Sequence, residues 1–420
     1  MKNITNLFFL FFLPSLSAQN YTYLKANRLF DGEMLYENKG ILIKDNKIES
    51  IDFQIVIEKK LPPNTTVIDL KNATLLPGLI EGHSHLLLHP YNETSWDDQV
   101  LKEARAERIS RATVHAEKTL MAGFTTVRDL GTEGADYDDV GLKTAIEKGI
   151  IKGPRMIVAT RALIATGSYA PKGFSPDIAV PQGAEEADGH DNLIQAVRRQ
   201  IGKGADVVKI YADYRWGFRG DAQPTYSLDE IKLIVETAKS SGRQTVAHAA
   251  TVEGMRRAIL GGVATIEHGD AGTPEIFKLM ASNNVCLCPT LAAGDAVSQY
   301  RGWRKGIDPE PDRIKNKRTT FKQALDAGVK ICMGGDVGVF AHGDNAREME
   351  MMVNYGMSPM ETLKSSTSIN ADVFNMGDKI GRLKIGLLAD IIAVEGNPTI
   401  NIEAIRKLVL VMKEGKIVRK

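Results

Sequence analysis

Cysteine is scarce in this chain: its 420 residues include only Cys286, Cys288 and Cys332. An odd number of cysteines without a regular spacing excludes the disulfide framework that is typical of small secreted domains. All three lie in apolar stretches, Val-Cys-Leu-Cys and Ile-Cys-Met, which favours buried free thiols. A soft-metal site at Cys286 and Cys288 has no further sequence pattern in its favour.

An excess of one charge is also absent. The chain has 53 Lys and Arg residues against 52 Asp and Glu residues, so its formal net charge is +1, and no long run of like charge stands out. Because nucleic-acid and membrane surfaces are recognised through concentrated positive charge, we expect neither as a partner. Hydrophobic residues make up 43% of the chain and charged residues 25%, as in an ordinary globular protein.

Long hydrophobic runs are missing except at the amino terminus. There, residues 7–13 are almost pure Leu and Phe, preceded by Lys2 and followed by proline and small residues. This pattern predicts a signal peptide over residues 1–18 with cleavage near Ala18, although Leu16 is not the small residue preferred at the −3 position. The run is too short to span a bilayer, and no cysteine follows it for lipid attachment. We therefore expect a secreted or periplasmic protein without a membrane anchor in its mature form.

A glycine-rich dinucleotide fingerprint is absent as well, although the chain has 38 glycines. Its absence after the first apolar segment disfavours a doubly wound nucleotide-binding sheet. Instead, apolar segments with polar ends alternate with segments of helical periodicity such as 193–201 and 228–238. The eight apolar segments are 75–85, 125–129, 155–160, 206–211, 245–248, 264–268, 285–289 and 330–336. Continuous apolar strands that alternate with helices predict an α/β fold, a (β/α)8 TIM barrel over residues 75–380.

Both ends of the chain have a different pattern. Residues 19–74 and 381–420 contain short strand-like stretches, with Asp45-Asn46 and Glu414-Gly415 as candidate hairpin turns. Neither segment is long enough to bury much of a core alone. We therefore predict that the two ends meet in one small β-sandwich domain beside the barrel.

Polar side chains cluster at the ends of the predicted barrel strands. In Leu-Ile-Glu-Gly-His-Ser-His, residues 79–85, the two histidines are two positions apart, so that both project from the same face of a strand. Later strands end in further candidate ligands, and the carboxyl ends of all barrel strands meet at one mouth. The full set is His83, His85, Lys209, His248, His268 and Asp336. This constellation predicts a metal site.

The motifs around these residues resemble the amidohydrolase superfamily. They are Leu-Pro-Gly-Leu-Ile-Glu-Gly-His-Ser-His (76–85), Val-Val-Lys-Ile-Tyr (207–211), Ala-His-Ala (247–249), Ile-Glu-His-Gly (266–269), Gly-Gly-Asp (334–336) and Gly-Arg-Leu-Lys-Ile-Gly-Leu-Leu-Ala-Asp (381–390). The resemblance covers nearly all of the chain beyond the predicted signal peptide. Within the superfamily the chain looks most like the branch that holds Xaa-Pro dipeptidases and imidazolonepropionase-like proteins.

The resemblance implies two divalent metal ions. His83, His85 and Asp336 would hold one, and His248 and His268 the other, bridged by Lys209 as a carbamate formed with CO₂. Imidazole and oxygen ligands suit zinc first, with manganese, iron, cobalt and nickel as alternatives. Burial lowers the pKa of a lysine and so provides the neutral amine that reacts with CO₂. The alternative is that Lys209 pairs with Asp336 in a metal-poor site.

The chemistry expected from such a site is hydrolysis of an amide-type C–N bond by a metal-bridging hydroxide. Asp336 would take the proton of the hydroxide and deliver it to the leaving nitrogen. The expected substrate is a dipeptide or an N-acyl amino acid. A cyclic amide, as in the imidazolonepropionase-like relatives, is the alternative, and a non-catalytic small-molecule-binding protein is the rival from another class. A homo-oligomer is compatible with the sequence.

Two motifs depart from the family pattern and concern the substrate more than the reaction. Many relatives carry Thr-Gly-Gly-His after the third strand, where this chain has Ala-Thr-Gly-Ser-Tyr and Tyr169 takes the place of the histidine. A tyrosine hydroxyl can donate the same hydrogen bond to a substrate carbonyl, or it is an ordinary loop aromatic. Relatives also often have Tyr or His where this chain has Ala250.

Other loops at the mouth supply candidate substrate-binding residues. The stretch 211–220 holds four aromatics and two arginines, of which Tyr211 and Arg215 are predicted to stack against a substrate and clamp a carboxylate. The alternative is a surface loop packed on its own aromatics. His342, in the loop 341–345 that follows the eighth strand, is predicted to line the same pocket.

A last group of polar residues is assigned structural roles. Arg128, Asp129 and Glu267 adjoin the motifs without completing the ligand set and are expected to form ion pairs or hydrogen bonds. The remaining histidines, His89, His115 and His190, are expected on the surface or in loops.

Overall fold

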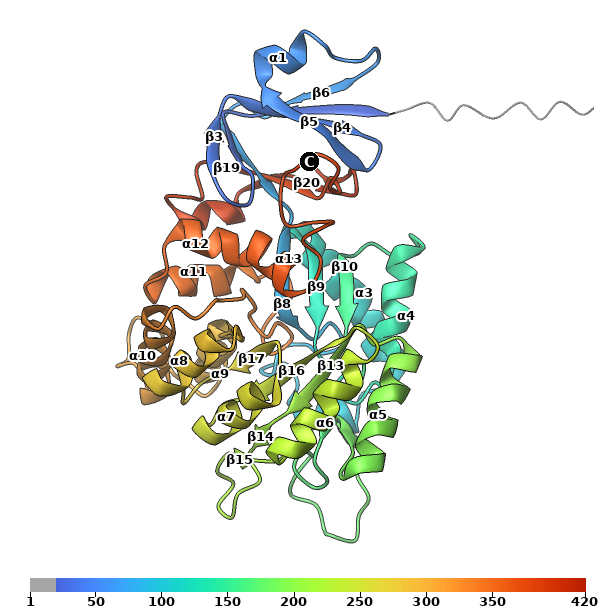
Figure 1. The fold of residues 1–420 in the computed structure, drawn as a ribbon, viewed down its shortest axis with the longest axis vertical. Coiled ribbons are helices and arrows are strands. Elements are labelled where there is room, and N and C mark those ends of the chain that lie inside the picture. Colours follow the sequence, from blue (N-terminus) through green and yellow to red (C-terminus); the bar gives the residue numbers. More distant parts are fainter. Residues whose placement is uncertain (1–19) are drawn as a thin grey trace, which may run out of the picture.

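The computed structural model describes residues 20–420. The predicted signal peptide lies outside the described residues and stays a prediction. Within the described part of the chain, no helix combines the length and the apolar character needed to cross a membrane. Figure 1 shows an α/β part with helices around a set of strands, and a smaller β part at one end that contains the carboxyl terminus.

The strands of the α/β part run parallel and in barrel order. One sheet has the order β10-β9-β8 and the other the order β12-β11-β13-β16-β17-β18. The bounds are β8 Leu79–Ser84, β9 Phe124–Asp129, β10 Arg155–Val158, β11 Leu163–Ile164, β12 Glu185–Glu186, β13 Val207–Tyr211, β16 Gln244–Ala249, β17 Thr265–His268 and β18 Cys286–Cys288. Residues Val207, Lys209 and Tyr211 of β13 pair with Gln244, Val246 and His248 of β16.

Hydrogen bonds connect the two sheets on both sides. The Asp206 N–H donates to Val158 O at 2.8 Å, which joins β10 to the start of β13. On the other side, the predicted eighth strand, 330–336, forms only isolated bridges, from Ile331 to Leu287 and from Val337 to Ser84. This segment therefore lies between β18 and β8, where the last strand of a barrel belongs, but it is not a regular strand.

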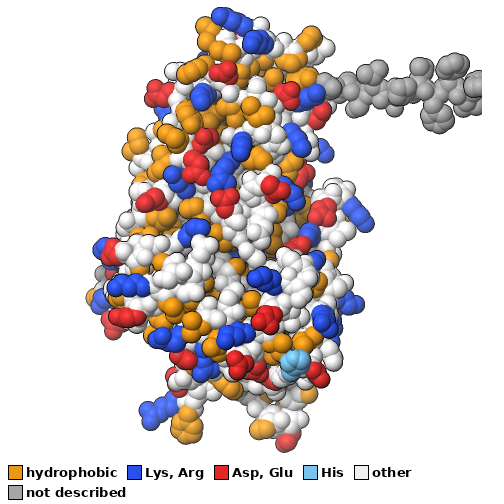
Figure 2. All heavy atoms as spheres, in the orientation of Figure 1, with side chains coloured by type: hydrophobic (Ala, Val, Ile, Leu, Met, Phe, Trp, Pro, Cys, Tyr) orange, Lys and Arg blue, Asp and Glu red, His pale blue; other side chains and the backbone are white. Residues whose placement is uncertain are grey.

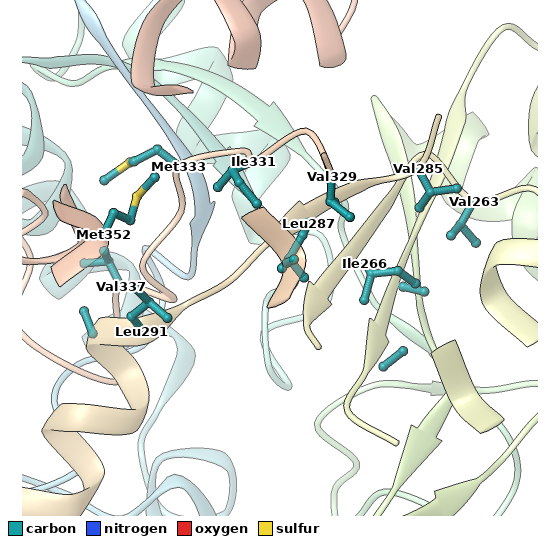
Figure 3. Packing of buried hydrophobic residues seen from close by; sticks show 14 of the residues in the cluster. Val263, Ile266, Val285, Leu287, Leu291, Val329, Ile331, Met333, Val337 and Met352 are labelled. Atoms are coloured by element: carbon teal, nitrogen blue, oxygen red, sulfur yellow. The ribbon is translucent and has the colours of Figure 1, made fainter. Parts of the chain in front are cut away.

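Side-chain packing holds that irregular segment in place. Ile331, Met333 and Val337 belong to the large hydrophobic cluster of the barrel, together with Leu287 and Met352 (Figure 3). All five side chains are buried. The apolar pattern of 330–336 therefore predicts its burial correctly, whereas the hydrogen bonds along it are local and discontinuous.

Helices cover the outside of the barrel strands and pack through apolar stripes. In α6, Ile231, Ile234 and Ala238 are buried on one face, and Ser227 and Glu230 form a capping box at its start. The helices are α1 Gln54–Glu58, α2 Trp96–Leu101, α3 Arg105–Met121, α4 Asp138–Glu147, α5 His190–Lys203, α6 Leu228–Lys239, α7 Val252–Gly261, α8 Pro274–Ser282, α9 Leu291–Tyr300, α10 Asp312–Asp326, α11 Ala346–Asn354, α12 Pro359–Lys364 and α13 Asn370–Val373, with a π-helix at Ser365–Ile369 and a 3₁₀ helix at Ile402–Arg406.

Both chain ends build the β part, which is a sandwich of two sheets with the orders β5-β4-β1-β6 and β21-β20-β19-β7-β2-β3. The strands are β1 Tyr21–Lys25, β2 Arg28–Phe30, β3 Leu35–Glu37, β4 Lys39–Lys44, β5 Lys47–Phe53, β6 Thr66–Asp69, β7 Ala73–Pro77, β19 Ile391–Glu395, β20 Leu408–Lys413 and β21 Lys416–Arg419. Leu24 and Ile41 of one sheet pack in one hydrophobic cluster with Leu75, Ile391 and Leu410 of the other. The predicted hairpin turns are confirmed, because Asp45 joins β4 to β5 and Glu414-Gly415 joins β20 to β21.

One strand prediction is wrong in an informative way. The apolar stretch 75–85 is not a single barrel strand, because β7 pairs with β19 and β2 in the sandwich and only β8 belongs to the barrel. The chain changes sheets at Gly78, where a Cβ atom would lie 2.2 Å from Thr125 Oγ1. Burial in two successive sheets looks like one apolar run in the sequence.

The predicted ligands lie at the end of the barrel that faces away from the sandwich. In Figure 1, β9 and β10 point away from the β part, so the carboxyl ends of the strands form the opposite mouth. A short hairpin at this mouth consists of β14 (Asp213–Tyr214) and β15 (Gln223–Pro224). On the face drawn in Figure 2, positive and negative side chains are intermingled, in agreement with the balanced composition.

Candidate metal centre and substrate cavity

The first barrel strand brings two histidines to a carboxylate. His83 lies at the end of β8 and His85 follows it, and the Oδ1 atom of Asp336 lies 3.6 Å from His83 Nε2 and 3.3 Å from His85 Nε2. The centroids of the two imidazole rings are 5.3 Å apart. The structure thus brings together the three members of the first predicted ligand set.

The remaining predicted ligands lie beside them. His248 of β16 and His268 of β17 have ring centroids 4.4 Å apart, and the His268 ring lies 5.3 Å from the His83 ring. Ligand atoms of His83, His268 and Asp336 all lie within 4.8 Å of one another. Lys209 is 1% exposed and lies in β13, which pairs with β16. Imidazole nitrogens and a carboxylate at these separations fit a divalent cation.

Hydrogen bonds to the second ring nitrogen orient three of these histidines. His83 Nδ1 lies 2.9 Å from Glu267 Oε2, and His85 Nδ1 lies 2.8 Å from Gly131 O. His268 Nδ1 lies 2.8 Å from Thr290 Oγ1. An imidazole whose Nδ1 is held in this way presents its Nε2 lone pair to a metal, which is the usual arrangement around protein-bound cations. The donor set therefore fits the metal centre that the sequence predicts.

Glu267 in turn pairs with Arg128, whose Nη2 donates to Glu267 Oε1 at 2.9 Å. Both side chains are buried, and the adjacent Asp129 accepts a hydrogen bond from the Leu86 N–H at 2.8 Å. The structural roles predicted for Arg128, Asp129 and Glu267 are confirmed. Glu267 also supports His83, a link that spacing in the sequence does not show.

The electrostatics keep His83 and His248 neutral and Asp336 ionised. Burial disfavours a charge on His85, but its hydrogen bond with Asp336 and the charge of that carboxylate raise the pKa of His85 to about 9, so a bound metal ion would have to displace a proton from this ring. Burial, together with the charge of Lys209, lowers the pKa of His83 to about 4 and that of His248 to about 3. Burial alone would raise the pKa of Asp336, but His83 and His85 lower it to about 2. Neutral imidazoles and a carboxylate are the protonation states that metal binding needs.

Lys209 is desolvated rather than paired. Burial lowers the pKa of its ammonium group. Among residues 20–420 it forms no ion pair, and its Nζ lies 5.7 Å from the centre of the Tyr211 ring. The alternative in which Lys209 pairs directly with Asp336 is not what this structure contains. A buried lysine with a lowered pKa supplies the neutral amine that carbamate formation requires.

A cavity of about 700 Å³ opens over these groups. Its wall includes His83, His85, His248, His268 and Asp336 and also three of the predicted substrate-binding residues, Tyr169, Tyr211 and Arg215. Tyr169 packs against Tyr211 and Trp96 with ring centroids 4.6 and 5.0 Å apart, and the Tyr211 ring stacks on His248 at 4.7 Å. The volume is that of a small-molecule site.

Sequence reasoning missed Glu133, a buried carboxylate in the cavity wall. Trp96 Nε1–H donates to its Oε2 at 2.9 Å, the Tyr169 hydroxyl donates to the same oxygen, and the Tyr211 hydroxyl lies 3.3 Å from its Oε1. The expectation that Tyr169 donates to a substrate carbonyl therefore needs correction, because its proton is directed to Glu133. The available signal was an acidic residue in the loop just beyond β9.

His342 lies elsewhere, contrary to prediction. Its Nε2 is 3.0 Å from Leu88 O, its ring stacks on His115 at 4.3 Å, and it does not belong to the cavity wall. The His342 imidazole is buried because it packs on the His115 ring and forms a hydrogen bond with the Leu88 carbonyl. His89, expected on the surface or in a loop, lies in a loop but is buried and pairs with Glu93 and Glu103.

Cationic side chains that sequence reasoning also missed line the same cavity. Arg313 and Lys317 come from α10, and Arg301 follows α9. Lys317 is already engaged, because its ammonium donates to His268 O at 2.6 Å and to Asp270. Arg313, like Arg215, forms no ion pair among the residues that the structure describes.

A family comparison agrees with this geometry. Residues 74–418 match the model of the amidohydrolase family. The chain belongs to that family. This amidohydrolase is a hydrolase of carbon–nitrogen bonds, built as a TIM barrel with a second, β-sandwich domain.

Similarity to individual relatives indicates the branch of the superfamily to which this amidohydrolase is most similar. Ochratoxinase of Aspergillus niger is 28% identical over 419 aligned residues, which cover 92% of this chain and 84% of that protein. Imidazolonepropionase of Fusobacterium nucleatum subsp. nucleatum is 23% identical over 401 residues, 87% of each chain. The crystal structure of a Xaa-Pro dipeptidase with bound methionine in its active site superposes with a TM-score of 0.83 and 31% identity, covering 96% of this chain and 100% of that one. The predicted branch of the superfamily is confirmed.

Proposed function

We propose that this amidohydrolase hydrolyses the amide bond of a dipeptide or an N-acyl amino acid with a free carboxylate, and that it does so after export and removal of its first 18 residues. The observation that carries the proposal is the cavity itself. Four histidines and an ionised aspartate line it, together with two arginines, Arg215 and Arg313, that have no ion-pair partner among residues 20–420. Similarity to a Xaa-Pro dipeptidase supports the dipeptide class.

The residues that would hold two divalent cations, most simply zinc, are those that the structure brings together. His83, His85 and Asp336 would form one ligand set and His248 with His268 the other, with Lys209 as a bridging carbamate. Bound cations would polarise the scissile carbonyl and lower the pKa of the attacking water.

In the proposed reaction Asp336 moves the proton. With a pKa of about 2 it is ionised at neutral pH and accepts the proton of the attacking water. It then delivers that proton to the amide nitrogen as the C–N bond breaks. His85 Nε2, 3.3 Å from Asp336 Oδ1, holds the carboxylate in position.

The wall of the cavity suits a substrate with a carboxylate. Arg215 and Arg313 have no ion-pair partner among residues 20–420, and both reach the cavity. Arginine binds carboxylates through paired hydrogen bonds, so either side chain would anchor the carboxylate end of the substrate. The aromatic rings of Tyr169, Tyr211 and Tyr214 offer a stacking surface for an apolar side chain.

The test begins with metal content per chain in protein purified without chelators, followed by assays on dipeptides, N-acyl amino acids and imidazolonepropionate. About two metals per chain and hydrolysis of the open-chain amides, lost on chelation, support the proposal. Turnover of the cyclic amide alone transfers the assignment to that reaction. Absence of both metal and turnover, after zinc and bicarbonate are supplied, contradicts the proposal and leaves a small-molecule-binding protein.

A further inference from the structure

Glu133 is a buried carboxylate without a cationic partner. Its side chain lies in the cavity wall, and the residue is 3% exposed. Within the described part of the chain it forms no ion pair; Arg108 donates to its backbone carbonyl at 2.8 Å and not to its carboxylate. Burying a negative charge without a counter-charge costs free energy of folding. The contacts within the fold do not account for a carboxylate at this position.

The neighbours of Glu133 turn this part of the wall into a surface of acceptors. An ionised carboxylate only accepts hydrogen bonds, so the hydroxyl protons of Tyr169 and Tyr211 are directed to it. Their oxygens then retain lone pairs and no free proton. The two Tyr oxygens, 3.4 Å apart, and the carboxylate together accept donors but offer none.

This acceptor surface adjoins the metal-ligand residues. A Cβ atom built on Gly131 would lie 3.3 Å from Glu133 Oε1 and 3.7 Å from the Cε1 atom of His85, so Gly131 lies between the two side chains. On the other side, the ring of Tyr211 stacks on His248 at 4.7 Å. A scissile carbonyl at the centre therefore has the acceptor surface next to it, whereas Arg313 approaches from α10.

We propose that Glu133, with the hydroxyl oxygens of Tyr169 and Tyr211, binds the α-ammonium group of the substrate. The inference rests on the proposed function and narrows it: the amidohydrolase prefers dipeptides with a free amino terminus over N-acyl amino acids. In a dipeptide a single Cα atom separates the ammonium nitrogen from the scissile carbonyl carbon, which agrees with Glu133 and His85 both lying within 4 Å of the Cβ position built on Gly131. The ammonium group has three hydrogen-bond donors and one positive charge. The acceptor surface has neither free donors nor a positive charge of its own, so the two are complementary.

Selectivity follows from the cost of leaving Glu133 unpaired. An N-acyl compound without the amine fills the same space but displaces water from the carboxylate and gives it no donor. A site built for a charged hydrogen-bond donor rejects the analogue that lacks it. The competing explanation is that Glu133 only positions the two tyrosines and does not contact the substrate.

The experiment compares alanyl-phenylalanine with N-propionyl-phenylalanine, which differ only in the amino group. For the metal-loaded wild-type protein we expect kcat/KM for the dipeptide to be roughly 10-fold or more above that for the propionyl compound. The variant Glu133→Gln has the same size without the charge. It should lower kcat/KM for the dipeptide by about 10- to 100-fold and leave the propionyl compound within about threefold, so that the preference disappears.

Controls separate this role from a structural one. Glu236→Gln, on the exposed side of α6, should change neither substrate, and Tyr169→Phe, which keeps the charge of Glu133, should reduce the dipeptide rate only modestly. Equal losses on both substrates in Glu133→Gln overturn the inference and leave Glu133 as a positioning residue for the tyrosines. A wild-type protein without preference overturns it as well.

Binding distinguishes failure of this inference from failure of the proposed function. If neither compound is hydrolysed, the proposed function fails, and calorimetry on the same metal-loaded proteins decides the role of Glu133. Tighter binding of alanyl-phenylalanine by the wild type, lost in Glu133→Gln, supports the ammonium site. Equal binding of the two compounds, or no binding of either, overturns it.

Discussion

Four residues at the mouth of the barrel have backbone conformations that residues other than glycine rarely adopt. The φ angles are 77° at His268, 61° at Asp336, 51° at Thr290 and 49° at Glu133. Left-handed conformations of this kind cost of order 1–3 kcal/mol each and cluster at functional sites. Here they occur at the candidate ligands His268 and Asp336, at Thr290, whose hydroxyl orients His268, and at Glu133 of the acceptor surface. The strain thus coincides with the groups that the proposed chemistry uses.

Asp336 is the residue whose loss should affect turnover most directly. Asp336→Asn removes the proton acceptor without changing the size of the side chain, and we expect kcat to fall by about 100-fold or more while the dipeptide still binds. Kinetics, with metal content measured in parallel, check this expectation. Asp326→Asn, at an exposed ion pair with Lys322, is the matched control. An Asp336→Asn protein with normal kcat would contradict the assigned role.

Lys209 should control how much metal the protein holds. Lys209→Ala removes the only amine at the centre among the six predicted ligands, so we expect metal content to fall from about two ions per chain to about one or less. Elemental analysis of the purified variant checks this, with Lys232→Ala on the exposed face of α6 as control. Unchanged metal content in Lys209→Ala would remove the bridging role.

Helices near the cavity depend on side chains from other elements. Helix α9, whose first residue follows the cavity residue Thr290, has no cap from its own side chain. Instead the carboxyl of Glu348 in α11 accepts from the Leu291 N–H at 3.0 Å and from the Ala292 N–H at 2.7 Å. A cap supplied across the fold satisfies the free N–H groups at the start of α9. It also ties α9, which borders the cavity, to α11.

This cap predicts a pH dependence of stability. Burial raises the pKa of Glu348 to about 8 from 4.5, so the folded state keeps a proton that the unfolded state loses. The unfolded state binds fewer protons over this range, and the free energy of unfolding from this group falls as pH rises between 4.5 and about 8, by up to about 1.4 kcal/mol per pH unit.

Glu348→Gln removes that contribution. The melting temperature of the wild type should therefore fall more between pH 5 and pH 8 than that of the variant, as thermal unfolding followed by circular dichroism would show. Glu236→Gln, an exposed glutamate, should keep the wild-type dependence. Parallel curves for the wild type and Glu348→Gln would show that Glu348 titrates normally.

At the scale of the whole molecule, the barrel and the sandwich are joined by polar contacts as well as by the chain. Arg155 at the start of β10 donates to Asp390 Oδ2 at 2.6 Å and to Glu414 Oε1 at 2.6 Å, both in the carboxyl-terminal part of the sandwich. Asp390 is 4% exposed. The sandwich lies at the end of the barrel away from the cavity, and none of its described residues lines that cavity (Figure 1).

Arg155→Met tests that contact. Removal of the guanidinium leaves the buried carboxylate of Asp390 without its partner, which should lower the free energy of unfolding by about 3 kcal/mol. The expected result is a clearly lower melting temperature with little change in kcat of the protein that remains folded. Arg198→Met, at an exposed site of α5, provides the comparison. Equal melting temperatures for the two variants would show that the contact contributes little.

Local patterns were enough to predict the architecture and the clustering of the candidate metal ligands. Apolar runs that end in polar residues predict parallel strands, and the carboxyl ends of such strands meet by geometry, so His83, His248 and Asp336 come together without knowledge of any loop. The turns at Asp45-Asn46 and Glu414-Gly415 were likewise predictable, because Asp45 and Gly415 are of residue types that tolerate the left-handed conformation that they adopt. These features depend on the spacing of residues within one segment.

Only the tertiary structure decided which loop and helix side chains enter the cavity. His342 turns away to stack on His115, whereas Glu133 and Arg313, which no motif singles out, enter it. The division of the run 75–85 between two sheets was equally invisible, since burial in either sheet requires the same apolar residues. The physical reason is common to all of them. The direction of a loop or of a chain crossing depends on contacts with residues distant in sequence, and those contacts exist only once the barrel and the sandwich have packed.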